Sequence, residues 1–91
     1  MISDELAEWI ADRNEDAILL DGYEEAIIGV AERYSQPPLA VYDGQRCVEI
    51  LMKRDGMDYD DAVEFFNFNT LGCWVGEHTP LIFWRANLTP L

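Results

Sequence analysis

AIIGVAERYSQPPLAVYD, residues 26–43, contains the main structural ambiguity of this chain. The apolar positions of residues 23–34 match one face of a helix, but the IIGV run is rich in β-branched side chains and is interrupted by Gly29. SQPP is typical of a turn, and LAVYD after it is a second strand-like run. We therefore predict a β-hairpin with strands at 26–34 and 38–42 and with the proline pair at its tip or edge. A helix over 23–34 remains the alternative.

Helix-forming segments flank this hairpin on both sides. On the N-terminal side, Ser3 can cap a helix over 4–13, in which apolar residues recur at helical spacing and Trp9 is expected to anchor the helix to the core. On the C-terminal side, Asp43 can cap a helix over 44–54. Gly56 then ends that helix, and Asp58 opens another one over 58–70.

Two short apolar runs complete the predicted fold. AILL at 17–20 lies between acidic residues, and LIFW at 81–84 follows the loop GEHTP, so we predict a strand at each. The resulting order is helix, strands, two helices and a last strand. This order predicts a single α+β domain over residues 1–91, in which three helices pack on a small antiparallel sheet of three or four strands.

The charge of the chain excludes several classes of partner. It has 91 residues and a formal net charge of -12, from 6 Lys and Arg against 18 Asp and Glu. This charge repels phosphate backbones, so we predict no direct nucleic-acid binding. No segment has the length and apolarity of a secretory signal or a membrane span, so we expect a cytoplasmic protein without membrane attachment. An acidic surface suits solubility, docking on a basic protein, or mimicry of a nucleic acid.

Several motifs resemble those of a widespread set of small proteins of unknown function from tailed phages and their bacterial hosts. The likeness covers residues 17–84 and rests on an AI-x-G strand, a YD pair, a GM-x-x-x-x-A turn, an F-N pair and a G-E-x-T-P loop. Here these are Ala26, Ile27, Gly29, Tyr42, Asp43, Gly56, Met57, Ala62, Phe68, Asn69, Gly76, Glu77, Thr79 and Pro80. The resemblance implies a phage-encoded or prophage-encoded accessory protein that acts in a bacterial cytoplasm, and it implies no activity.

Metal and catalytic sites find little support in the residue pattern. A structural zinc site needs four ligands, and Cys73 and His78 form the only close Cys/His pair, so we interpret Cys73 and Cys47 as buried thiols. The acids of 58–64 lack the glycine turn and the spacing of a calcium loop. We therefore expect no cofactor, no metal and no enzymatic activity.

A surface of acids and aromatic rings is the positive hypothesis that the sequence supports best. Phe65, Phe66 and Phe68 cannot all face one way on a helix, so one of them is exposed or buried at a second contact. An exposed Phe68 with Trp residues near it would form an apolar patch typical of a protein interface. The partner-binding candidates are Asp58, Asp60, Asp61, Glu64, Phe68, Trp74 and Trp84, with Asp21, Glu24 and Glu25 as further acids for phosphate mimicry.

Three functions are therefore open. The first is a non-enzymatic accessory protein that binds a host protein, basic or nucleic-acid-handling, as an inhibitor in host takeover or anti-defence. The second is a small-molecule-binding protein or minor enzyme with a site in the loop 74–79, where Glu77, His78 and Thr79 supply the polar groups. The third is a structural homodimer.

Overall fold

The β-hairpin predicted within residues 26–43 is present. The computed structural model describes residues 3–72 and 75–86 of the chain. In it, β1 (Ile27–Ala31) pairs antiparallel with β2 (Leu39–Asp43), and the helical alternative is confined to the short 3-10 turn η1 (Glu24–Ala26) before β1. The pairing register shifts between Ile27 and Gly29, where Gly29 has a φ of +146° that L side chains rarely adopt. A glycine thus permits the irregularity that a β-branched residue would strain.

Local caps place the helices where the sequence predicts them. The hydroxyl of Ser3 accepts a hydrogen bond from the Leu6 N–H at the start of α1 (Asp4–Arg13). The carboxylate of Asp43 does the same for Arg46 at the start of α2 (Gly44–Asp55), which ends at Gly56 in the left-handed region. Asp58 accepts from the Asp61 N–H at 2.8 Å and starts α3 (Tyr59–Phe66). These N-terminal caps satisfy amides that have no partner within the helix.

The predicted helix over 58–70 divides into two parts. After Phe66 the chain continues as a π-helical turn, η2 (Asn67–Leu71), and Gly72 follows. At this junction the side-chain amide of Asn69 donates to the Phe65 carbonyl oxygen at 3.0 Å. Such π-helical turns are frequent at functional sites.

Two strand predictions need correction. Residues 17–20 are not a strand, because the described amides of this run hydrogen bond outside any ladder: Ile18 N–H donates to the His78 carbonyl and Leu20 N–H donates to the Tyr42 hydroxyl. The last strand, β3 (Leu81–Phe83), is parallel to β2 and not antiparallel. The helices α2 and α3 lie between the two strands in sequence and return the chain to the same end of the sheet, which a tight hairpin turn cannot do.

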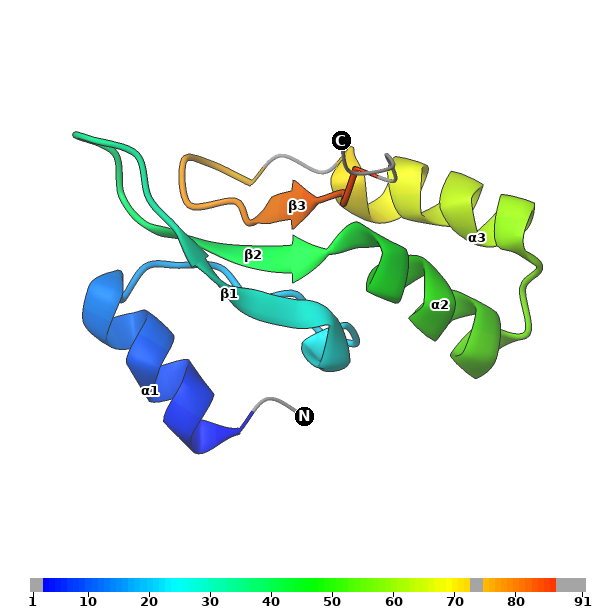
Figure 1. Ribbon diagram of the computed structural model, residues 1–91, viewed down its shortest axis with the longest axis horizontal. Helices are drawn as coiled ribbons and strands as arrows, with labels where there is room; N and C mark the ends of the chain where they lie inside the picture. Colours follow the sequence, from blue (N-terminus) through cyan, green and yellow to red (C-terminus); the bar gives the residue numbers. More distant parts are fainter. Residues whose placement is uncertain (1–2, 73–74, 87–91) are drawn as a thin grey trace, which may run out of the picture.

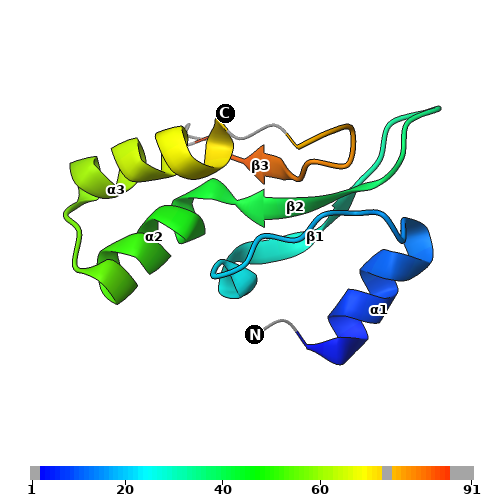
Figure 2. The ribbon, with the colours of Figure 1, turned by 180° about the vertical axis from the view of Figure 1, so that it is seen from behind.

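The described residues form an α+β domain of three α-helices and one mixed sheet in the order β1-β2-β3. Figure 1 shows α2 and α3 side by side beyond the end of β2, with α1 on the opposite side of the molecule next to β1. The view from behind shows the same separation of α1 from the α2–α3 pair (Figure 2).

The main core lies between the sheet, η1 and the α2–α3 pair. Its buried side chains come from four elements and from the residue before η1, and they are Tyr23, Ala26, Ala40, Tyr42, Cys47, Val48, Leu51, Ala62 and Phe66. The predicted anchor of α1 is wrong, because Trp9 is 41% exposed and Arg13 lies 3.6 Å from the centre of its ring, whereas Ile10 is the buried residue. No helix in the described ranges is both long and apolar enough to span a bilayer.

Candidate functional site

The outer face of α3 carries an acidic notch that is lined by aromatic rings. Residues 61, 64, 65 and 68 follow the i, i+3, i+4, i+7 spacing of one helix face. They line a cavity of about 390 Å³. The described residues that line it are Met57, Asp61, Glu64, Phe65, Phe68 and Asn69, and we call this set the α3 notch. The structure thus brings together three of the seven predicted partner-binding residues, namely Asp61, Glu64 and Phe68.

The aromatic rings of the α3 notch are open to solvent. Phe68 is 78% exposed and Phe65 is 39% exposed, whereas Phe66 between them is fully buried. The prediction that the three rings cannot all face one way is confirmed, since Phe65 and Phe68 line the notch and Phe66 lies in the core. Exposed phenylalanine rings of this size next to carboxylates form an amphipathic surface that can bury apolar area against a partner.

The four acids of 58–64 have different roles. Asp58 is a helix cap, so its carboxylate is already bound to a backbone amide. Asp60 is exposed outside the notch, while Asp61 and Glu64 line it. No Lys or Arg occurs between Gly56 and Trp84 in the sequence, so no cation from this segment compensates these carboxylates. The notch is therefore a local source of negative potential.

Of the two predicted tryptophans, Trp84 does not line the notch. Trp74 lies outside the described residues. Trp84 packs on the first turn of α2, where a side chain at Gly44 would come within 2.7 Å of its ring, and it meets Phe66 edge-on at 6.0 Å. Although Trp84 is half exposed, its contacts are those of an anchor for the end of β3.

Two acids of the second group, which comprises Asp21, Glu24 and Glu25, lie near cations of α2. Glu24 and Glu25 line a shallow pocket together with Lys53 and Arg54 of α2. The Arg54 guanidinium donates to the Gly22 carbonyl at 3.0 Å. The pKa of the Glu24 carboxyl is lowered by hydrogen bonds that it accepts from the backbone N–H groups of Glu24 and Gly22. Glu24 therefore stabilises the turn before η1, and the nearby Lys53 and Arg54 make this group less negative than the α3 notch.

His78 joins the loop before β3 to the end of α1. Its Nδ1 lies 3.0 Å from the side-chain nitrogen of Asn14, which also donates to the Pro38 carbonyl at 2.8 Å. The Asn14 side-chain oxygen accepts from the Asp16 N–H, so the amide orientation is defined by three contacts. An amide N–H can only donate, so His78 Nδ1 accepts and the proton of the neutral ring is on Nε2, 3.6 Å from a Glu77 oxygen. This arrangement gives His78 a structural role.

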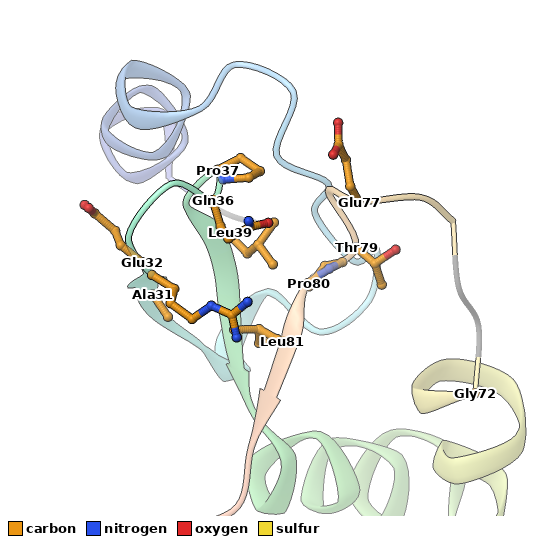
Figure 3. A pocket seen from close by; sticks show the side chains of 11 residues that line it. Ala31, Glu32, Gln36, Pro37, Leu39, Gly72, Glu77, Thr79, Pro80 and Leu81 are labelled. Carbon is orange, nitrogen blue, oxygen red and sulfur yellow. The ribbon is translucent and has the colours of Figure 1, made fainter.

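The other two residues of the predicted loop site line a larger cavity. Glu77 and Thr79 lie on one wall of a space of about 680 Å³, and residues of the hairpin loop lie on the other (Figure 3). The Thr79 hydroxyl is already engaged, since it donates to the Gly76 carbonyl at 2.6 Å and accepts from the Val75 N–H at 3.0 Å. The hairpin contributes Arg33, Gln36 and Leu39 to the lining, which sequence reasoning missed. Residues 33–36 and 77–80 are far apart in sequence, so no local motif indicated that they meet.

The described cysteine has the properties of a buried thiol. Cys47 is fully buried in the core, and desolvation, with a smaller effect of the nearby Asp43 carboxylate, raises the pKa of its thiol to about 12. A thiol with this pKa is protonated at neutral pH and is a poor nucleophile and metal ligand. Within residues 3–72 and 75–86, no cluster of three or more His, Cys, Asp or Glu side chains could hold a metal ion. Cys73 lies outside the described residues.

Comparison of the chain with protein-family models, with curated proteins and with solved structures returned no match.

Proposed function

We propose that this chain is a non-enzymatic binding protein that docks on a basic surface of another protein through the α3 notch. The observation that carries the proposal is the juxtaposition of two exposed phenylalanine rings with Asp61 and Glu64 in one depression of the surface. Aromatic rings at the centre of a patch supply most of the affinity of a typical interface. Carboxylates beside them select a partner of opposite charge and accelerate encounter.

The charge of the whole chain supports the same class of partner. With a formal net charge of -12, the protein attracts basic surfaces over distances of about a Debye length, ~8 Å at physiological ionic strength. The notch lies in a segment without Lys or Arg, so the local and the global fields have the same sign. A host protein that handles nucleic acid has such a basic surface, and an acidic ligand there would act as an inhibitor by occupying it. The resemblance to small phage proteins is consistent with this use in a bacterial cytoplasm.

An affinity pull-down from bacterial lysate, compared between variants, tests the proposal. In the variant Asp61→Lys/Glu64→Lys the notch changes sign, so a partner retained by the wild-type protein at low salt should be lost. The control is Glu8→Lys/Asp12→Lys, which makes the same charge change on two exposed residues of α1. This control should retain the partner, and circular dichroism should show that both variants are folded.

A third variant separates aromatic docking from charge alone. Phe68→Ala removes an exposed ring without changing charge, and we expect it to weaken the captured complex by about tenfold, as for a central interface aromatic. A partner that binds the wild-type protein and the notch variant equally would contradict the proposal. If only the bait returns and its melting temperature rises with protein concentration, the homodimer replaces the host-protein complex as the better interpretation.

A further inference from the structure

The larger cavity lies on the side of the sheet opposite to the main core. In β2, Ala40 and Tyr42 are buried in the core, so Leu39 and Val41 face the other side of the sheet. In β3, Ile82 packs against the core, and Leu81 and Phe83 are correspondingly exposed. The sheet therefore has a second, apolar face that the helices α2 and α3 do not cover.

A row of apolar side chains across this outer face forms the floor of the cavity. Ala31 of β1 pairs with Leu39 of β2, and Leu81 of β3 pairs with Val41, two residues after Leu39. Paired residues and residues two apart lie on the same side of a sheet, so Ala31, Leu39 and Leu81 share this outer face and form a diagonal row across the three strands. Pro37 and Pro80 stand at the edges of this row and have fixed backbone angles (Figure 3). The floor is thus apolar and partly pre-organised.

Two carboxylates and one guanidinium line the cavity. Figure 3 shows the carboxylates of Glu32 and Glu77 at the outer edge, directed away from Leu39 and Leu81. Glu77 also lies 3.6 Å from the His78 ring. Among the described residues, Arg33 is the only cation that lines the cavity, and no carboxylate lies within 4.0 Å of its guanidinium. A guanidinium presents a planar set of donors that matches a carboxylate.

From this arrangement we infer that the cavity binds a small organic carboxylate with an apolar body. The apolar body lies on the row of Ala31, Leu39 and Leu81, and the carboxylate binds the Arg33 guanidinium. The volume of about 680 Å³ is within the range of roughly 300–1,000 Å³ that is usual for small-ligand sites. This site is separate from the α3 notch and does not depend on the proposed partner.

Titration with octanoate, followed by amide NMR shifts, tests the inference. Octanoate has a carboxylate and an apolar chain, and 1-octanol is the matched neutral probe. Octanoate should cause saturable shifts at residues 31–39 and 79–81. Arg33→Gln should weaken octanoate binding by about fivefold or more, because a charge-assisted hydrogen bond is lost, and should leave 1-octanol binding unchanged.

Two further variants serve as controls for charge and for the apolar floor. Arg46→Gln removes the same charge from an exposed position of α2 that does not line the cavity, so octanoate affinity should stay at the wild-type value. Leu81→Thr retains a strand-forming residue but reduces the apolar floor, so it should weaken octanoate and 1-octanol alike.

Three results would overturn the inference. The first is the absence of saturable shifts with octanoate. The second is an equal octanoate affinity of the Arg33→Gln and Arg46→Gln variants. The third is a set of shifts centred on the α3 notch, around Phe65 and Phe68, which would show that octanoate binds another apolar surface. Amide spectra of each variant without probe establish that the fold is retained.

Discussion

Phenylalanine occurs on both sides of the segment formed by α3 and η2, with an opposite role on each side. Phe66 is fully buried and meets the rings of Tyr23 and Trp84 edge-on, at 5.8 and 6.0 Å. Phe68, two residues later, is 78% exposed beside Asp61 and Glu64. The inner side therefore contributes to stability, and the outer side is available for recognition. Hydrophobicity alone does not distinguish the two rings; their direction relative to the core does.

The largest expected effect tests this division directly. Phe66→Ala removes a ring from the core and should lower the free energy of unfolding by about 3–5 kcal/mol, since burial is lost and a cavity is left. Phe68→Ala should change it by less than about 0.5 kcal/mol, because the ring is mostly in water already. Urea unfolding measures both. Similar losses in the two variants would mean that the outer ring is also a core residue.

Alkaline pH should lower the free energy of unfolding through buried groups on the inner side, in the core. In the unfolded chain the Cys47 thiol has an ordinary pKa, about 8.5, whereas in the folded protein its pKa is about 12. As pH rises through this interval, the unfolded state loses the thiol proton first. The free energy of unfolding therefore keeps its full value below pH 8 and falls above it, by at most about 1.4 kcal/mol per pH unit. Burial also raises the pKa of the Tyr42 hydroxyl, which adds an effect of the same sign at higher pH.

The measurement is urea unfolding at pH 7 to 10 of Cys73→Ser and of Cys73→Ser/Cys47→Ala. The single variant should lose more stability between pH 8 and pH 10 than the double variant does. Parallel pH profiles would contradict a core position for the protonated thiol.

The smallest expected effect concerns the acids at the start of α3. Asp58→Ala removes the cap on the Asp61 N–H and should cost about 1 kcal/mol of unfolding free energy. Asp60→Ala removes the same charge from an exposed position without a capping bond, so its effect should stay within about 0.5 kcal/mol. Asp58→Asn keeps an oxygen acceptor, so it should retain most of the stability that Asp58→Ala loses. Thermal melts of the three variants measure the difference, and an equal cost for Asp58→Ala and Asp60→Ala would show that charge, not capping, is responsible.

The candidate site was only partly predictable from the sequence. The acids of α3 and the exposed Phe68 were expected, because helical spacing alone shows that adjacent phenylalanines cannot share a face. Trp84 was expected in the same patch but packs against Gly44 and Phe66, since the parallel pairing of β3 carries it to the start of α2. The sequence did not predict that Arg33 lines the larger cavity. In the runs 39–42 and 81–83 every side chain is apolar, so the sequence shows neither which side chains lie on the outer face of the sheet nor what lies over them.

The sequence by itself determined the features that depend on contacts within a few residues. Three helix starts are set by the caps Ser3, Asp43 and Asp58, because each capping side chain is only three residues from the amide that it binds. One helix end is set by Gly56, because its left-handed backbone angle is a property of that single residue. The hairpin also depends on residues that are close together in the sequence. Tertiary structure alone decided the parallel direction of β3, the absence of a strand at 17–20 and the packing of Trp84 on the start of α2. Each of these depends on which distant segment supplies the hydrogen-bond partner or the covering surface, and local preference does not contain that information.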